Sequence, residues 1–311
     1  MPDRTRLVGE ARFDVLPLPA RDVLGEGPWW SVAQQCLFRV DILGRRVHRT
    51  NLDGDRAESW ATPDEVGFVV PNEAGDLLVG LRDGLCWLDP ESGETTPDTP
   101  VEAGRGDYRI NDGKTDRRGR VWFGTMHKDE TEGRASLYRY DSRGLGAVIR
   151  GITTSNGLGW SPDETVMYHT DSISRRIMAY DFDADSAELR GGRLFAEDPA
   201  GHVPDGLTVD GDGCVWGAKW NGGKVVRYAP DGRVDRELTL PVSRPTSCMF
   251  VGPDLRTLAV TSARPAPSEG AREELAGSVF LIETGAQGLP ERPTIMPSRG
   301  SESPHPLSPS Q

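Results

Sequence analysis

Residues 213–232 read GCVWGAKWNGGKVVRYAPDG: a short apolar run, an Asn–Gly–Gly loop, a second apolar run and an Asp–Gly turn. Val, Trp and Tyr favour β-strands, whereas Asn–Gly and Asp–Gly pairs favour tight turns. The stretch therefore predicts two neighbouring antiparallel strands. It is one copy of a repeat, and the repeat decides the fold.

The same order of elements occurs five more times along the chain. The other copies cover residues 36–55, 76–93, 120–144, 165–185 and 256–285. Successive copies start roughly 40–48 residues apart, the spacing of four-stranded propeller blades. A single blade leaves an apolar face uncovered, whereas a closed ring of blades buries it. The sequence predicts an all-β fold, a six-bladed β-propeller with four-stranded blades around a central axis.

The ends of the chain define the expected domain. A ring closes when a strand from one terminus completes a blade formed by the other, and ARFDVLPLP at residues 11–19 is the candidate for that strand. We expect one propeller domain over residues 11–295. Residues 296–311 are rich in Pro and Ser, and we expect a disordered tail there because this composition buries little apolar surface.

Composition narrows the classes of partner. The net charge of −12 disfavours nucleic acids and anionic membranes, both of which repel an acidic protein. No run approaches the ~20 apolar residues of a membrane span, and residues 1–10 lack the apolar run of a secretory signal. We therefore expect a cytoplasmic protein. The four cysteines lie far apart and indicate buried packing residues, and the oligomeric state stays open.

Common catalytic motifs are missing, and no histidines are spaced as a metal-binding pair. What stands out is a set of polar residues before the first strand of four repeats. The four stretches begin GEGPWW at residue 25, RINDGK at 109, SNGLGW at 155 and PDGLTV at 204. Because a repeat places equivalent positions at equivalent radii, we expect Asn111, Asn156 and Asp205 to point toward the axis, with Glu26 in a similar place. Carboxylate and amide oxygens suit a hard cation.

Turn formation is the alternative interpretation of these motifs, because Asn–Gly and Asp–Gly pairs are standard turn formers. We interpret Asp210 and Asp212, in VDGDG, as blade-turn residues of this kind. The occurrence of four such sites in register with the repeat favours a shared site over four independent turns. Lys219 and Trp220 precede a further Asn–Gly–Gly turn, and their position places them near the same axial pocket.

These motifs resemble those of the SMP-30/gluconolactonase/regucalcin family. The resemblance runs from about Gly25 to Arg264 and rests on stretches that occur in the family's order. They are LGEGPWW, RINDGKTDRRGRVWFGTM, SNGLGWSPDETVMYHTDS, PDGLTVDGDGCVW, WNGGKVVRY and RPTSCMF. The resemblance implies a six-bladed propeller that hydrolyses a sugar-derived lactone to the aldonic acid.

The resemblance also assigns roles to individual residues. It implies that Glu26, Asn156 and Asp205 bind one divalent metal ion and that Asp205 acts as the general base. The ion would polarise the lactone carbonyl as a Lewis acid. Arg109 and Asn111, in the family's R-x-N-D-G-K motif, would contact the sugar. Three oxygen ligands accept Ca, Mg, Mn, Zn or Fe, so the sequence does not name the metal.

Residues 127–133, HKDETEG, depart from the family pattern just after Gly124–Met126. This stretch often contributes an acidic substrate contact in the family. Asp129 is our candidate for that role, with Glu130 as the alternative. Because the match is weakest here, the identity of the lactone stays open.

Two other functions fit a propeller of this kind. A phosphotriesterase-like hydrolase would use a similar metal site but needs an apolar pocket, which the R-x-N-D-G-K stretch does not supply. A non-catalytic cation-binding or scaffold propeller is the other, since the fold alone does not decide function. A scaffold has no functional need to bring Glu26, Asn156, Asp205, Arg109 and Asn111 together at one end of the channel. The positions of these five residues therefore distinguish an enzyme from a scaffold.

Overall fold

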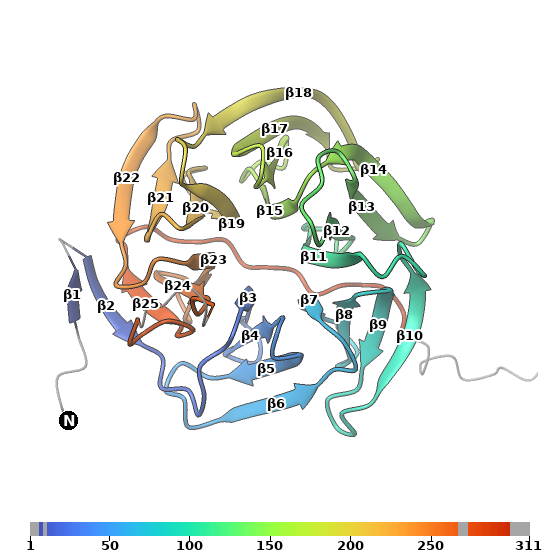
Figure 1. Cartoon of the computed structure of the whole chain (residues 1–311), viewed down its shortest axis with the longest axis horizontal. Helices are drawn as coiled ribbons and strands as arrows, with labels where there is room; N and C mark the ends of the chain where they lie inside the picture. The colour runs from blue at the N-terminus through green and yellow to red at the C-terminus, as the bar shows by residue number, and fades with distance from the viewer. Residues whose placement is uncertain (1–5, 9–10, 267–272, 299–311) are drawn as a thin grey trace, which may run out of the picture.

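The computed structural model describes residues 6–8, 11–266 and 273–298. Its strands form six antiparallel sheets, and each sheet is one blade of a closed ring (Figure 1). The predicted six-bladed β-propeller is confirmed. No helix in these residues has the length and apolar character needed to cross a membrane.

In five blades, four strands follow one another outward from the axis in chain order. Blade 1 contains β3 (Gly25–Ser31), β4 (Cys36–Asp41), β5 (Arg46–Thr50) and β6 (Ala57–Ala61). Blade 2 contains β7 (Val66–Pro71), β8 (Leu77–Leu81), β9 (Gly84–Leu88) and β10 (Thr95–Pro100). Blade 3 contains β11 (Tyr108–Thr115), β12 (Val121–His127), β13 (Ala135–Asp141) and β14 (Gly144–Ile152).

Blades 4 and 5 continue the pattern. Blade 4 contains β15 (Ser155–Trp160), β16 (Val166–Asp171), β17 (Arg176–Asp183) and β18 (Glu188–Glu197). Blade 5 contains β19 (Val203–Val209), β20 (Val215–Trp220), β21 (Lys224–Tyr228) and β22 (Val234–Thr239). The innermost strand of each blade faces the axis, and neighbouring inner strands pack on one another.

The sixth blade is built from both ends of the chain. It contains β23 (Pro245–Val251), β24 (Thr257–Ser262), β25 (Phe280–Glu283), β2 (Ala11–Val15) and β1 (Arg6–Val8). Strand β2 pairs with β25, Phe13 lying opposite Ile282, and the rings of Phe13 and Phe280 meet edge to face at 5.5 Å. The predicted closing strand at the start of the chain is therefore confirmed. Its pairing with β25 closes the ring by joining the two ends of the chain.

The hydrophobic core lies between neighbouring blades. Trp29 and Phe38 of blade 1 pack in one cluster with Val69 of blade 2, and Phe68 of blade 2 stacks on Phe123 of blade 3 with centroids 5.8 Å apart. Burying a side chain of this size contributes about 1.5–3 kcal/mol. Because the apolar faces meet between the blades, polar side chains can project from the inner strands into the axial channel.

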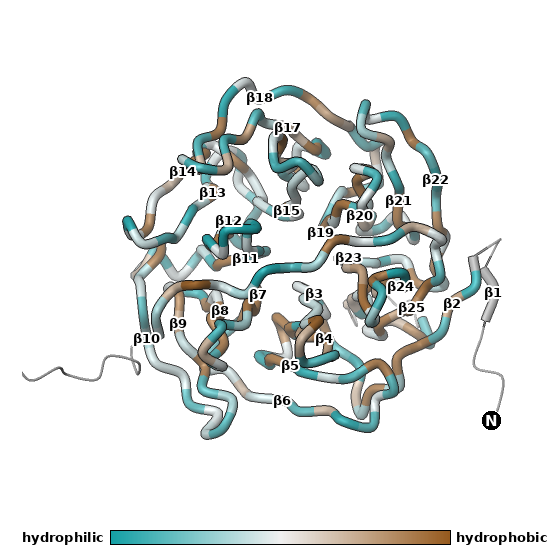
Figure 2. Tube along the Cα trace, turned by 180° about the vertical axis from the view of Figure 1, so that it is seen from behind, coloured by the Kyte–Doolittle hydropathy of each residue, from teal (hydrophilic) through white to brown (hydrophobic). Residues whose placement is uncertain are grey.

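A segment that we call the strap, residues 286–298, crosses one end of the axial channel (Figure 2). Gly288 pairs with Asp210 just after β19, and Thr294 pairs with Asn72 just after β7. The strap thus joins the ends of inner strands from opposite sides of the ring. The sequence repeat gave no sign of it, because the strap belongs to no blade.

The strap also corrects the predicted domain boundary. Met296 and Ser298 are buried, and the Asn72 side-chain amide donates to the carbonyl of Met296. The packed domain therefore continues through Ser298, past the expected end at residue 295. The remainder of the expected tail, residues 299–311, lies outside the described residues.

Candidate functional site

Every inner strand loses its register with the next strand at one position near its start. A β-bulge of this kind turns side chains out of the regular alternation. The break follows Glu26 in β3 and Asn156 in β15, and it spans Asp205 in β19 and Asn111 in β11. The predicted axial residues are therefore the bulge residues of four blades.

Glu26, Asn156 and Asp205, here called the axial triad, line one cavity of about 280 Å³ together with Arg109 and Asn111. The cavity opens at the end of the ring where the inner strands begin, opposite the strap. The sequence predicted that these five side chains converge, and the structure places all of them in this one cavity. None of its described lining residues comes from blade 2 or blade 6.

Within the triad, Asn156 and Asp205 are in direct contact. The Asn156 side-chain amide donates to Asp205 Oδ1 and to Ser172 Oγ, the latter at 3.2 Å. Gly157 makes this approach possible, because a Cβ there would lie 2.6 Å from the backbone oxygen of Asp205. With its nitrogen engaged in this way, the buried Asn156 Oδ1 has no hydrogen-bond partner. This oxygen lines the same cavity as the Glu26 and Asp205 carboxylates. A buried acceptor that lacks a donor is unusual in a folded protein and calls for an explanation.

Negative charge accumulates at the triad, where the Arg109 guanidinium opposes the rise in the pKa of both acids. Burial, and then the charges of Asp205 and Asp112, raise the pKa of Glu26 well above its usual range. Burial and the Asp112 charge likewise raise the pKa of Asp205, against the lowering effect of the Asn156 hydrogen bond. Burial raises the pKa of Asp112 to about 6. Buried carboxylates of like charge disfavour ionisation, and a bound cation reverses that preference.

The donor set fits a hard divalent cation. Two carboxylates and the free Asn156 oxygen supply three oxygen ligands and leave room for water or substrate. In the described part of the chain, no three His, Cys, Asp or Glu side chains converge closely enough to hold a metal by themselves. A cation held here would therefore need the amide oxygen as a third protein donor.

Arg109 is held in place through Asn111. Arg109 Nη1 donates to Asn111 Oδ1 at 2.6 Å, and Asn111 Nδ2 donates to the Ser155 carbonyl at 2.9 Å. Ser155 Oγ shares a hydrogen bond of 2.8 Å with His169 Nε2, which anchors this wall of the cavity. Asn111 thus positions Arg109, whose other N–H groups are available to a ligand. Burial lowers the pKa of Arg109, and nearby acids, Glu65 and Glu26 first, oppose that effect.

The acidic residue predicted from the 127–133 loop needs correction. Asp129 does not line the cavity, whereas Glu130 does. The Asp129 N–H donates to His127 Nδ1 at 3.2 Å, and His127 Nε2 lies 2.7 Å from Asp107 Oδ2. Glu130 has the left-handed backbone conformation, with φ of 51°. The loop is braced on His127, and the turn at Glu130 brings this residue, the alternative candidate, to the cavity.

Trp220 lines the cavity as its position predicted, but Lys219 does not. Lys219 is fully buried, its Nζ lies 2.6 Å from Asp198 Oδ2, and its role is structural.

The apolar part of the cavity lining was not anticipated from the sequence. It comprises Leu24, Ile42, Met126, Ile173, Val203 and Trp220. A signal was present: Leu24 and Val203 each precede a triad residue by two positions, at the same end of an inner strand. The expectation that the R-x-N-D-G-K stretch supplies no apolar surface holds for β11, but apolar side chains reach the cavity from other strands.

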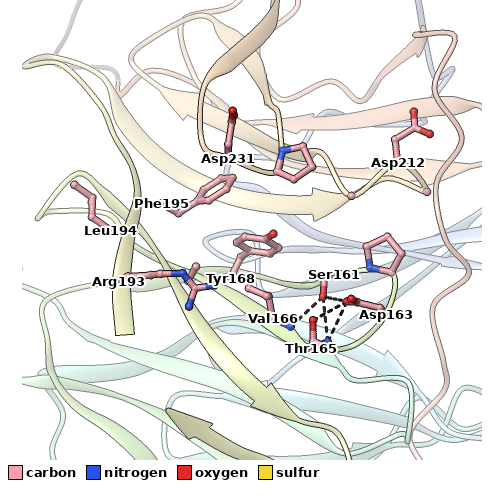
Figure 3. Close-up of a pocket in the computed structure, with 15 residues that line it drawn as sticks. Ser161, Asp163, Thr165, Val166, Tyr168, Arg193, Leu194, Phe195, Asp212 and Asp231 are labelled. Atoms are coloured by element: carbon pink, nitrogen blue, oxygen red, sulfur yellow. Dashed lines mark hydrogen bonds between the residues drawn. The ribbon is translucent and has the colours of Figure 1, made fainter. Parts of the chain in front are cut away.

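A larger hollow of about 620 Å³ lies between blades 4 and 5, away from the predicted residues (Figure 3). Asp163 at its edge accepts hydrogen bonds from Ser161 Oγ at 2.6 Å and Thr165 Oγ1 at 2.9 Å. These bonds cap the turn between β15 and β16. The hollow contains no orphaned acceptor comparable to Asn156, so size alone does not mark the site.

The sequence of this chain matches the family model for the SMP-30/gluconolactonase/LRE-like region over residues 24–264. The chain belongs to this family. It is 37% identical over 278 residues to 6-deoxy-6-sulfogluconolactonase from Pseudomonas putida, with 86% of this chain and 94% of the relative covered. It is 35% identical over 284 residues to L-arabinolactonase from Azospirillum brasilense, covering 86% and 91%.

A solved structure gives the same result for the fold. The calcium-binding protein regucalcin from Agrobacterium tumefaciens superposes with a TM-score of 0.84 at 28% identity, over 91% of this chain and 96% of that one. The matched region of the family contains all four bulge motifs. Both the family and the fold expected from the sequence are confirmed.

Proposed function

We propose that this protein hydrolyses a sugar-derived lactone to the aldonic acid, using one divalent cation held by Glu26, Asn156 and Asp205. The observation that carries the proposal is the buried Asn156 oxygen without a hydrogen-bond partner, in a cavity that Glu26, Asp205 and Arg109 also line. Relatives named as sugar lactonases support the reaction class. A cation bound there would supply Lewis-acid polarisation of the lactone carbonyl.

We assign the transfer of the proton to Asp205. Its Oδ1 is occupied by the Asn156 amide, which leaves Oδ2 to accept a proton from the attacking water. Water oxygen forms the new bond to the carbonyl carbon, and the bond from that carbon to the ring oxygen breaks. The proton held at Asp205 then passes to the departing ring oxygen, which becomes the hydroxyl of the open acid. The aldonic acid is ionised at neutral pH, so turnover releases a proton and acidifies the solution.

Arg109 and Glu130 orient the sugar from the blade 3 side. Arg109 offers directional N–H donors to hydroxyl oxygens, and Glu130 offers acceptors to hydroxyl protons. Asn111 fixes the Arg109 guanidinium, so we assign it a positioning role. A scaffold protein has no use for hydroxyl-binding groups beside two buried acids in one cavity.

A pH-indicator assay with glucono-, galactono-, xylono- and arabinono-lactone tests the proposal. The enzyme is treated with chelator, and Ca²⁺, Mg²⁺, Mn²⁺, Zn²⁺ and Fe²⁺ are added back singly. Rates are corrected with the Glu26→Gln variant, since these lactones also open spontaneously. We expect cation-dependent hydrolysis of at least one lactone. A protein that binds a cation but opens no lactone would contradict the proposal, and turnover of a phosphotriester in its place would favour the alternative hydrolase.

A further inference from the structure

Ser172 contacts Asn156, one of the three proposed cation ligands. It directly follows β16 in blade 4, is 3% exposed and lines the axial cavity. Its N–H donates to the Thr154 carbonyl and its carbonyl accepts from the Arg175 N–H, each at 3.0 Å. These two bonds fix the backbone of Ser172, and the hydroxyl takes part in neither of them.

The direction of each hydrogen bond at the Ser172 hydroxyl follows from the chemistry of its partners. Ser172 Oγ lies 2.7 Å from the Pro204 carbonyl oxygen, which can only accept, so the single hydroxyl proton is donated there. Toward Asn156, 3.2 Å away, the hydroxyl can then only accept. An amide nitrogen donates and an amide oxygen does not, so this contact requires the Asn156 nitrogen on the side of Ser172.

The Asn156 amide has one further acceptor. Its nitrogen also donates to Asp205 Oδ1, so its two N–H groups have two acceptors, and Oδ1 of the amide is left without a partner. Asp205 is itself a proposed ligand and proton acceptor, whereas Ser172 has no role in either. Because the Pro204 carbonyl belongs to β19, Ser172 also ties the amide of blade 4 to the strand that carries Asp205.

We infer that Ser172 is a positioning residue that fixes the orientation of the Asn156 amide and keeps its oxygen available to a divalent cation. The inference rests on the cation site of the proposed function. With the amide reversed, its N–H groups would take the place of the ligand oxygen, and they have no lone pair to offer a cation. An amide that is oriented before the cation arrives loses less conformational freedom on binding.

The cation affinity of Ser172→Ala measures this role without reference to activity. Mn²⁺ is titrated into the chelator-treated full chain, and we expect the affinity to fall by about 10- to 100-fold, the range for residues that orient metal ligands. Ser262→Ala is the matched control and should keep wild-type affinity. Ser262 is also buried, and its Oγ donates to the Ser278 carbonyl at the same distance of 2.7 Å, but it does not line the cavity.

A double-mutant cycle with Asn156→Asp tests whether Ser172 acts through the amide. A carboxylate presents an oxygen in either orientation, so an aspartate at this position does not need to be oriented. On the Asn156→Asp background, Ser172→Ala should change the affinity by no more than about twofold, the limit within which independent effects add. An equal loss on both backgrounds would overturn the inference, because Ser172 would then affect the cation by another route.

Ser172→Thr and Ser172→Val compare two side chains of the same shape, of which only threonine retains the hydroxyl. The threonine variant should bind Mn²⁺ at least about tenfold more tightly than the valine variant. This pair decides the question if Ser172→Ala does not fold, which its melting curve without cation shows. Equal affinities within the pair, or wild-type affinity in Ser172→Ala, would overturn the inference and leave the proposed function standing. If the wild type binds no cation, the cation site of the proposed function fails, and this inference fails with it.

Discussion

Two buried aspartates lie near the two ends of strand β19, and the groups around their carboxylates differ. Asp210, just after the strand at the strap end, accepts hydrogen bonds from Trp216 Nε1 at 2.8 Å, Arg227 Nη2 at 2.7 Å and the Cys214 N–H at 2.9 Å. Asp205, near the start of the strand at the cavity end, has the Asn156 amide as its side-chain partner and like charges nearby. Burial is common to both residues, and the difference lies in how their charge is balanced.

Blade 3 repeats this contrast. Asp116, at the strap end after β11, accepts from Arg120 Nε at 2.6 Å and from Trp122 Nε1 at 2.9 Å. Asn111 and Asp112, at the bulge in the same strand, line or adjoin the axial channel. Asp210 accepts a hydrogen bond within its blade turn, as the turn interpretation of VDGDG predicted. Both strap-end acids also accept a hydrogen bond from the Trp side chain of the second strand. The cavity-end acids Glu26 and Asp205 instead have carboxylates among their charged neighbours and a raised pKa.

The largest effect that we expect is on catalysis. Asp205→Asn should lower kcat/KM for the hydrolysed lactone by about 10³-fold, or about 4 kcal/mol of transition-state stabilisation, since it removes a proton acceptor and a ligand. The melting temperature should stay the same or rise, because the substitution relieves repulsion with Asp112 and Glu26. A large fall in melting temperature would mean that Asp205 has the structural role of Asp210.

The opposite change should affect folding and spare catalysis. Asp210→Asn removes the carboxylate that pairs with Arg227 in a buried environment. We expect the loss of this ion pair to lower the free energy of unfolding by about 3 kcal/mol. Chemical denaturation measures this loss, and kcat/KM of the protein that remains folded should be unchanged. Equal stability in the variant would show that the paired acid at the strap end is dispensable.

A smaller effect concerns pH. Burial lowers the pKa of His169 from 6.5 to about 4, so the unfolded chain takes up this proton first. The contribution of neutral His169 to stability is present above about pH 6.5 and is lost as the pH falls toward 4. Between these values, His169→Gln should show a shallower rise of unfolding free energy with pH, by no more than about 1.4 kcal/mol per pH unit. Parallel curves for both proteins would contradict the assignment.

The sequence predicted what its repeats encode. Blade number, the closing strand and the convergence of Glu26, Asn111, Asn156 and Asp205 all follow from equivalent positions in a ring. The strap was not predictable in this way, because residues 286–298 belong to no blade and pair with the ends of inner strands from opposite sides of the ring. Nor was the choice of Glu130 over Asp129, which depends on a local turn braced by His127. The apolar lining of the cavity needed the structure because its members come from four blades.

Cation binding tests the central contrast most directly. Mn²⁺ and Ca²⁺ are titrated calorimetrically into chelator-treated wild type, Asp205→Asn and Asp210→Asn, at a temperature where all three are folded. We predict one equivalent of cation for wild type and for Asp210→Asn with similar affinity. For Asp205→Asn we predict a loss beyond the roughly 10- to 100-fold that outer-shell substitutions cost. Wild-type affinity in Asp205→Asn, or a loss confined to Asp210→Asn, would contradict the account.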